Sequence, residues 1–189
     1  MISSACVMNT GYNHQSIVNA AKNQIDKLIH FSNDYFYTEP QIHLAEELVK
    51  ITPGTFDKKV IYGFAGSDSI DAAIKVSRAY TGRSKIVSFI GAYHGSTYGA
   101  ISISAIDLNM KRNIGPLLPD VFHLPYPLTT EFADGENDET FSEKKFKEFK
   151  KNFELYIPAD EVAAIFIEPI AGDLGLVLPP KNFMLQLKR

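Results

Sequence analysis

Apolar residues recur at two different spacings along the chain, and these spacings predict alternating helices and strands. Apolar positions three and four residues apart indicate helices, whereas short runs that are apolar almost throughout indicate buried strands. The expected helices cover residues 15–29, 40–51, 67–80, 97–105 and 141–156, and the expected strands cover residues 59–64, 85–89, 121–124 and 162–167. Strands that are apolar on both faces are typical of a parallel sheet between helical layers. We therefore expect a three-layer α/β/α fold with a mainly parallel sheet.

Capping and breaking residues mark the ends of several predicted helices. Asn13 precedes the first apolar helical pattern and is a candidate cap for it. The second helix is expected to stop at Pro53-Gly54, and the third at Gly82. Asp134-Gly135 lies in a polar loop before the last predicted helix.

The first candidate site is the turn from the strand at residues 59–64 into the following helix. In sheets of this kind, ligands bind beyond the carboxyl ends of the strands. Gly66 permits a sharp turn, and Ser67 offers a hydroxyl and an amide at a helix N-terminus, where an anion such as phosphate is favoured. The alternative is that Ser67 only caps the helix while Asp68 complements its dipole. Considered alone, this turn favours the alternative.

Two further loops carry distinctive residues at the same predicted edge. Tyr93 follows the strand at residues 85–89 and can lie flat on a planar ligand, or it can pack against the loop, with His94 satisfied by its neighbours. Glu168 follows a fully apolar strand, which is an expensive place for a carboxylate unless the site uses it. The alternative is that Glu168 accepts hydrogen bonds from loop amides.

Composition and charge narrow the class of protein. With 189 residues the chain can bury a core, and its net charge of −3 argues against nucleic acid as a partner. The N-terminus does not resemble a signal peptide, and no apolar run is long enough for a membrane span, so we expect no membrane partner. Cys6 is the single cysteine, so an internal disulfide and a cysteine-based metal cluster are excluded. We expect a cytoplasmic location and no metal site.

Four motifs, in this order, resemble those of the class III aminotransferases, which are pyridoxal-phosphate (PLP) enzymes of fold type I. The motifs are NTGYNH at residues 9–14, AGSDSIDAAIK at 65–75, GAYHG at 91–95 and EPIAGDLG at 168–175. Within that family, the chain most resembles the 4-aminobutyrate aminotransferases. The implied fold is an incomplete large domain of fold type I.

The resemblance implies a role for each candidate residue. Gly66 and Ser67 correspond to the pair that holds the PLP phosphate, and Tyr93 to the aromatic residue that stacks on the pyridine ring. Glu168 corresponds to an acidic residue beside the cofactor. Asp173 corresponds to a glutamate that pairs, on the substrate side, with a carboxylate-binding arginine of the small domain.

The chain departs from the family pattern at several of these motifs. Ala65 and Asp68 replace the usual serine or threonine and glutamate around the phosphate turn. Ser96 stands where a basic residue usually follows GAYHG, which removes a contact to a substrate carboxylate. Ala171 replaces a common glutamine, and Asp173 is one methylene shorter than glutamate. These differences weaken the inference about the substrate more than the inference about the family.

The resemblance also predicts that the chain is truncated. The aspartate that holds the pyridine nitrogen and the lysine that forms the Schiff base are expected beyond residue 189, so no catalytic residue is assigned here. Residues 1–55 are expected to form an N-terminal helical segment, and residues 56–189 a partial PLP-binding large domain. Without the lysine, the chain alone is expected to be inactive.

The parent reaction implied by the resemblance is PLP-dependent transfer of an amino group from 4-aminobutyrate, or a related ω-amino acid, to a 2-oxo acid. Alternatives are a non-catalytic PLP-binding, phosphate-binding or dimerisation module, and a fragment of an amino-acid racemase or epimerase of the same family. An unrelated α/β domain is disfavoured by the four ordered motifs.

We also expect a homodimer or another self-association. In the family's sheet, later strands lie between the first strand and the fourth. The strand at residues 162–167 would therefore present a bare edge, unless the strand at 59–64 docks on it or a partner molecule fills the gap.

Overall fold

The computed structural model describes residues 7–32 and 35–188, and the chain divides into two compact units, Met1–Val60 and Ile61–Arg189. Cys6 lies outside the described residues.

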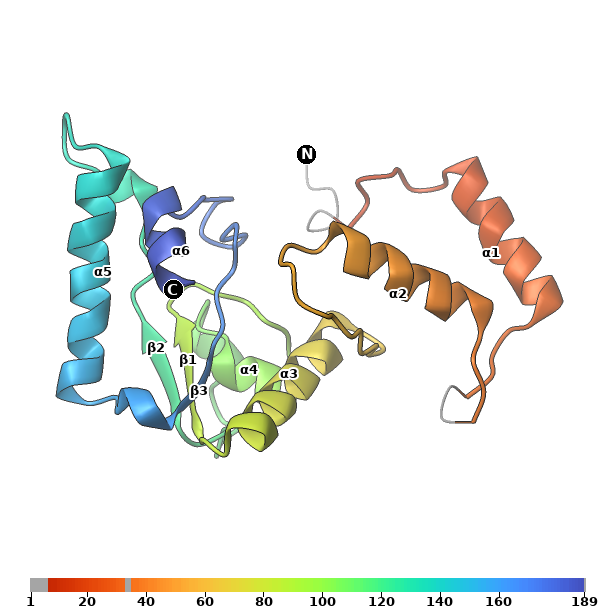
Figure 1. Ribbon diagram of the computed structural model, residues 1–189, viewed down its shortest axis with the longest axis horizontal. Coiled ribbons are helices and arrows are strands. Elements are labelled where there is room, and N and C mark those ends of the chain that lie inside the picture. Colours follow the sequence, from red (N-terminus) through yellow and green to blue (C-terminus); the bar gives the residue numbers. More distant parts are fainter. Residues whose placement is uncertain (1–6, 33–34, 189) are drawn as a thin grey trace. The chain divides into compact units, whose positions relative to one another are not determined.

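The first unit contains helices α1 (Gln15–Lys27) and α2 (Glu39–Ile51) (Figure 1). His14, and not Asn13 as expected, occupies the N-cap position of α1, and its side chain makes no capping hydrogen bond. After α2, the Lys58 ammonium donates to the carbonyls of Val49 and Thr52, which satisfies acceptors at the end of that helix. Neither helix buries a residue fully.

The strand expected at residues 59–64 is not formed. These residues have no regular secondary structure, and the Phe64 side chain is fully exposed. A strand requires a neighbouring strand for its backbone hydrogen bonds, and within the described part of the chain this segment has none. Of the two expected arrangements at the edge of the strand at residues 162–167, direct docking of this segment is therefore not observed, and filling of the gap by a partner molecule stays a prediction.

The second unit is built on a parallel sheet of β1 (Lys85–Phe89), β2 (Val121–Leu124) and β3 (Val162–Ile165), in the order β2-β1-β3. Ile86 pairs with Val121 on one side and with Ala164 on the other. The expected strands at 85–89 and 121–124 are confirmed, and β3 ends two residues earlier than expected. The amide of Phe166 still donates to the Val87 carbonyl at 2.8 Å, so extended pairing continues briefly past the end of β3.

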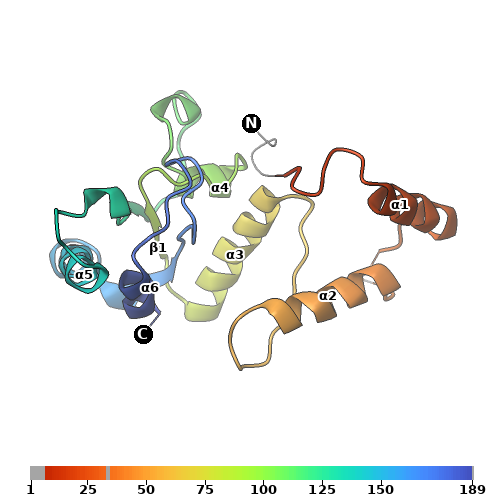
Figure 2. The same ribbon diagram turned by 90° about the horizontal axis from the view of Figure 1, so that it is seen from above.

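The sheet separates two hydrophobic cores, as the alternation of side chains along β1 requires. Val87 and Phe89 point to one face, where they pack with α5 (Asp138–Leu155) and α6 (Lys181–Leu187). Ile86 points to the opposite face, where it packs with Ile74 of α3 (Gly66–Thr81) and Ile103 of α4 (Tyr98–Ile103). Figures 1 and 2 show the two pairs of helices on either side of β1. The predicted α/β/α layering is confirmed.

The helix ends of the second unit follow local chemistry. The α3 helix ends at Gly82, which has a left-handed φ of 68°, as its sequence position predicts. The α5 helix begins earlier than expected because the Asn137 side chain accepts from the Thr140 amide at 2.9 Å. The α6 helix was not predicted. Three short 3-10 helices cover Leu108–Met110, Thr129–Glu131 and Ala159–Glu161.

None of the helices in the described ranges is both long and apolar enough to cross a bilayer. The same residues contain no group of three or more histidine, cysteine, aspartate or glutamate side chains placed to hold a metal ion.

Candidate functional site

The helix α3 begins at Gly66, directly in the turn that the sequence singled out. Ala65 is its N-cap residue, and Ser67 is the second helical residue, so the alternative that Ser67 caps this helix is wrong. The first backbone amide of α3 that finds a backbone acceptor in the described chain is that of Ser69, which donates to the Ala65 carbonyl at 3.2 Å. The amides of Gly66 and Ser67 are therefore available to an anion at the positive end of the helix.

The turn before α3 is held by Asp68. Its carboxylate accepts a hydrogen bond from the Phe64 amide at 3.1 Å. A Cβ on Gly63 would lie 2.9 Å from the Asp68 Cβ, so the chain can pass this closely only because residue 63 is glycine. Asp68 thus does more than complement the helix dipole, because it also fixes the entry of the chain into α3.

Ser67 is joined to the loop that follows β1. Its hydroxyl oxygen accepts from the Ser96 amide at 3.1 Å, which leaves the hydroxyl proton free to be donated elsewhere. Gly95 has φ of +125°, and a Cβ at this position would collide with the Ser67 hydroxyl. Glycine is therefore required twice, by its backbone conformation and by the close approach of the two loops.

Tyr93 lies between these loops and the loop that follows β3. Its hydroxyl is 3.0 Å from the Ser96 hydroxyl, and its backbone amide donates to Glu168 Oε1 at 2.8 Å. The side chain is 42% exposed, so part of the ring remains open to a ligand. The position suits an aromatic platform held at both its backbone and its hydroxyl.

Glu168 connects two loops through both of its carboxylate oxygens. Oε1 accepts from the Tyr93 amide, and Oε2 accepts from the Gly172 amide at 2.8 Å. The Glu168 backbone carbonyl accepts from the Tyr126 hydroxyl at 3.1 Å. The alternative interpretation from the sequence, in which this carboxylate binds loop amides, describes the observed contacts.

Close packing brings the same two loops together a second time. Gly91 has φ of +87°, and a Cβ there would collide with the Leu174 side chain. Ala171 and Val177 form an antiparallel bridge that closes the loop after β3 on itself. The loops after β1 and β3 therefore form one packed edge.

His94 has a structural role in this edge. Its backbone amide donates to Ser104 Oγ at 2.8 Å, and its Nε2 lies 3.3 Å from Ser88 Oγ. Because the Ser88 hydroxyl donates to the Ile103 carbonyl at 2.6 Å, Nε2 is the donor in its contact with Ser88. Burial lowers the pKa of His94, against a smaller opposing effect of Glu168, so the ring is neutral at pH 7. The expectation that neighbours satisfy this histidine is confirmed.

Asp173 is not joined to the other candidate residues. It is exposed, and its carboxylate makes no hydrogen bond or ion pair with the residues that the structure describes. Its substrate-side role stays a prediction.

Sequence reasoning missed Tyr126, which supports the site from behind. The side chain is 5% exposed, and burial together with the nearby Glu168 charge raises its pKa to about 12. Its position between Pro125 and Pro127 gave no indication of this contact with a loop 42 residues away. Ser96 was noted only as a departure from the family pattern, yet it bonds to both Ser67 and Tyr93.

Together, three hydrogen bonds link Ser67 to Ser96, Ser96 to Tyr93 and Tyr93 to Glu168, with the backbone and side chain of Ser96 and of Tyr93 each making one bond. The edge presents a helix N-terminus with free donors next to a partly open aromatic ring. Such an edge can hold a phosphate group and a flat ring attached to it.

The whole chain, residues 1–189, matches the family model described as "Aminotransferase class-III". The chain therefore belongs to the class III aminotransferase family.

Several curated relatives align over nearly the whole chain. An isoleucine 2-epimerase of Lentilactobacillus buchneri is 48% identical over 97% of this chain and 41% of that protein. An alanine/serine racemase of Pyrococcus horikoshii is 42% identical over 100% of this chain and 40% of that protein. A probable 4-aminobutyrate aminotransferase of Bacillus subtilis is 32% identical over 94% of this chain and 41% of that protein. The chain thus spans about two fifths of the length of these relatives.

A solved structure agrees with the fold. It is that of a taurine:2-oxoglutarate aminotransferase from Bifidobacterium kashiwanohense in complex with PLP and glutamate. It matches with a TM-score of 0.87 and 32% identity, over 100% of this chain and 42% of that chain. The second unit is accordingly part of a fold type I large domain.

Proposed function

We propose that the edge formed by Gly66, Ser67, Tyr93 and Glu168 binds PLP. The observation that carries the proposal is the set of three hydrogen bonds that links Ser67 to Glu168, which places a free helix N-terminus beside an accessible tyrosine ring. The amides of Gly66 and Ser67 and the Ser67 hydroxyl would bind the phosphate. Gly66 faces open space, with no atom within 4 Å of a Cβ placed there, so this side of the turn has room for a phosphate.

Each side chain has a distinct task in this proposal. The Tyr93 ring would lie against one face of the pyridine ring and help to exclude water from it. Glu168 would act indirectly, because its oxygens are bonded to the amides of Tyr93 and Gly172 and so orient the Tyr93 loop. PLP, when bound, supplies an electron sink that stabilises negative charge on the substrate carbon next to the amino group.

The proposal includes the lysine that anchors the cofactor, which we place outside these 189 residues. Four residues are linked by hydrogen bonds at this edge: Ser67, Ser96, Tyr93 and Glu168. In the described part of the chain, no lysine side chain hydrogen-bonds to any of them. Lys75 lies inside α3, where it continues the helix. We accordingly expect no transamination or racemisation by the isolated 189-residue chain above the rate of free PLP.

For the whole reaction, we propose racemisation or epimerisation of an α-amino acid. The support is the identity of 48% to an isoleucine epimerase and 42% to an alanine/serine racemase, against 32% to a probable 4-aminobutyrate aminotransferase. The replacements at Ser96, Ala171 and Asp173 also fall on the substrate side of the family motifs. Transfer of an amino group from 4-aminobutyrate to a 2-oxo acid is the second candidate, because 4-aminobutyrate aminotransferases are among the relatives.

Binding of the cofactor can be tested on the 189-residue chain by fluorescence titration. PLP should bind more tightly than pyridoxal, which lacks the phosphate, and inorganic phosphate should compete with PLP. Ser67→Ala should weaken PLP binding about fivefold to tenfold, because a hydrogen bond to a charged group is lost. Ser69→Ala is the matched control, since the Ser69 hydroxyl bonds to the Ala65 carbonyl within the same turn. Equal binding of PLP and pyridoxal would refute the phosphate assignment.

The reaction class can be tested on the natural gene product in heavy water. A racemase or epimerase exchanges the α-hydrogen of L-isoleucine or L-alanine for deuterium and forms the other isomer without any 2-oxo acid. A transaminase turns over repeatedly only when an acceptor such as 2-oxoglutarate is present, and it converts that acceptor into the corresponding amino acid. Production of glutamate from 4-aminobutyrate, without formation of D-amino acid or allo-isomer, would replace the first candidate by the second.

A further inference from the structure

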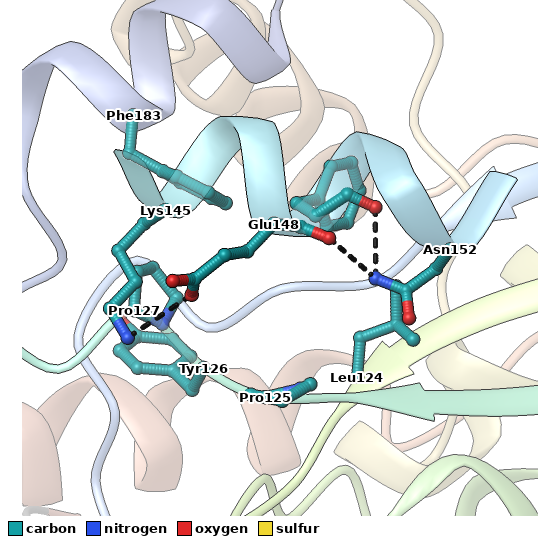
Figure 3. Close-up of a pocket in the computed structure, with 9 residues that line it drawn as sticks. Leu124, Pro125, Tyr126, Pro127, Lys145, Glu148, Asn152 and Phe183 are labelled. Carbon is teal, nitrogen blue, oxygen red and sulfur yellow. Dashed lines mark hydrogen bonds and ion pairs between the residues drawn. The ribbon is translucent and has the colours of Figure 1, made fainter. Parts of the chain in front are cut away.

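A cavity of about 240 Å³ lies at the carboxyl end of β2, between the segment that follows this strand and the helices α5 and α6 (Figure 3). Pockets for drug-sized ligands usually measure about 300–1,000 Å³, so this cavity suits a smaller organic molecule. It is distinct from the edge assigned to PLP, although Tyr126 lines it and donates to the Glu168 carbonyl behind that edge.

The floor of the cavity is apolar. Leu124, Phe149 and Phe183 line it, and each is at most 8% exposed. Phe149 and Phe183 also contact each other edge to face, with ring centroids 5.8 Å apart, so this floor is held firmly in place. A hydrocarbon group of a ligand would gain free energy by leaving water for this surface.

The polar wall carries Lys145 and Glu148, and a second carboxylate, that of Glu131, pairs with Lys145 from outside the lining. The Lys145 ammonium lies 2.6 Å from Glu131 and 3.4 Å from Glu148, so two carboxylates share one cation. The hydrogen bond to Glu131 is the main reason that the pKa of Lys145 is raised. Lys145 is therefore engaged mainly by Glu131, and Glu148 keeps most of its capacity to accept hydrogen bonds.

The other polar side chains of the wall, those of Tyr126 and Asn152, already make hydrogen bonds, and Tyr126 donates to the Glu168 carbonyl. The Asn152 amide donates to the backbone carbonyls of Glu148 and Phe149, and its oxygen accepts from the Tyr156 hydroxyl at 2.8 Å. Figure 3 shows the Glu148 carboxylate directed toward Lys145 and the segment of Tyr126 and Pro127. Glu148 is thus the group that a ligand in this cavity would meet.

These charges select the kind of ligand. A carboxylate would find no unpaired cation and would be repelled by Glu148, whereas a neutral molecule would gain nothing from the negative wall. An ammonium group can donate to Glu148 and balance the excess of the two carboxylates, Glu131 and Glu148, over Lys145.

We propose that this cavity binds a small primary ammonium compound with an apolar tail. The ammonium group would pair with Glu148, and the tail would lie against Leu124, Phe149 and Phe183.

Titration of the 189-residue chain without PLP, followed by amide NMR shifts, tests the proposal with 3-methylbutylamine as the probe. Two molecules of the same shape, 3-methylbutanoate and 3-methyl-1-butanol, serve as comparisons. The amine should bind at least about fivefold more tightly than either, and its shifts should include Phe149 and Phe183.

Substitutions on α5 separate charge from shape. Glu148→Gln should weaken amine binding about fivefold while the 56% exposed side chain leaves the fold intact. Lys145→Met should strengthen amine binding, because both carboxylates then lack their cation. Glu154→Gln, on the same helix but away from the cavity, should change nothing. Equal affinity for the three probes, unchanged affinity in Glu148→Gln, or no binding at tens of millimolar amine would each overturn the proposal.

Discussion

Gly95 shows how a single residue decides the geometry of the candidate site. It holds the loop after β1 against Ser67 in a backbone conformation that few other residues adopt. Gly95 matters because it lacks a Cβ, which would collide with the Ser67 hydroxyl. The same reasoning applies to Gly91 and its contact with Leu174.

Gly95→Ala is expected to damage PLP binding more than stability. The added Cβ must displace the Ser67 hydroxyl, so the affinity for PLP should fall about tenfold or more, with a loss of about 1–3 kcal/mol of unfolding free energy. Fluorescence titration and urea denaturation measure the two effects. Gly82→Ala is the control, because it strains a glycine with φ of +68° but meets no neighbouring atom. If both variants bind PLP alike, the contact with Ser67 does not matter.

Tyr126 predicts how stability depends on alkaline pH. Its pKa is raised from 10.0 to about 12, first by burial and then by the charge of Glu168. Above pH 10, the unfolded chain loses this proton before the folded chain does, so stability should fall between about pH 10 and pH 12, by on the order of 2 kcal/mol. Urea unfolding across this range measures the fall.

Tyr126→Phe provides the comparison, since lysines also titrate in this range. The variant lacks the phenol and should show a shallower loss of stability with rising pH. An identical slope in both proteins would show that Tyr126 does not titrate as described.

At the scale of elements, the sequence predicted correctly those elements that nearby residues specify. It failed for elements that depend on residues far away in the chain. The β1 and β2 strands and the end of α3 are specified locally, by short apolar runs and by Gly82, and they were predicted correctly. The segment 59–64 has the same apolar pattern, but a strand also needs a neighbour, which a pattern cannot show.

The candidate site divides in the same way. Gly66, Ser67, Tyr93 and Glu168 were found because their motifs resemble those of a family. The contacts of Tyr126 and Ser96 could not be predicted from a sequence pattern. Tyr126 bonds to a residue far away in the chain, and Ser96 bonds to Ser67 through its backbone amide. Likewise, the α6 helix is short, and the Asp138 carboxylate that accepts its first amides lies 43 residues earlier.

The six-residue helix α4 depends on α3 for its first turn. Asp71 of α3 accepts a hydrogen bond from the Ala100 amide at 2.8 Å. Asp71→Ala should therefore reduce the free energy of unfolding by about 1 kcal/mol, as the loss of a capping side chain does. Asp71→Asn keeps an acceptor oxygen and should lose less. Equal losses in urea denaturation would show that the hydrogen bond contributes nothing.

At the scale of the whole molecule, the main feature is surface that could pair with another chain, namely open strand edges and exposed apolar side chains. The outer edges of β2 and β3 have no partner strand within the described residues, and both α1 and α2 leave apolar residues such as Ile25 and Leu44 exposed. Exposed strand edges and apolar helix faces favour association with another chain.

We therefore predict that the chain self-associates in a concentration-dependent way. The Phe166 amide points toward β1, so by alternation the neighbouring Ile165 amide points to the outer edge of β3. Ile165→Pro removes this outward donor and should weaken association through this edge. Sedimentation of both proteins over a range of concentrations measures the difference. A stable monomer at high concentration in the unaltered protein would contradict the prediction.

The position of β1 between β2 and β3 also has a consequence for the order of folding. Pairing β1 with β2 closes a loop of roughly 35 residues, whereas pairing it with β3 closes roughly 77, and longer closures are less favourable and slower. The bond between the Tyr93 amide and Glu168 can form only after the second closure. In pulsed hydrogen exchange during refolding, the Tyr93 amide should therefore become protected later than the amides that β1 and β2 share. The candidate site would then be the last part of the second unit to assemble. Newly made chains would pass through a stage that has a core but cannot yet bind PLP in the proposed way.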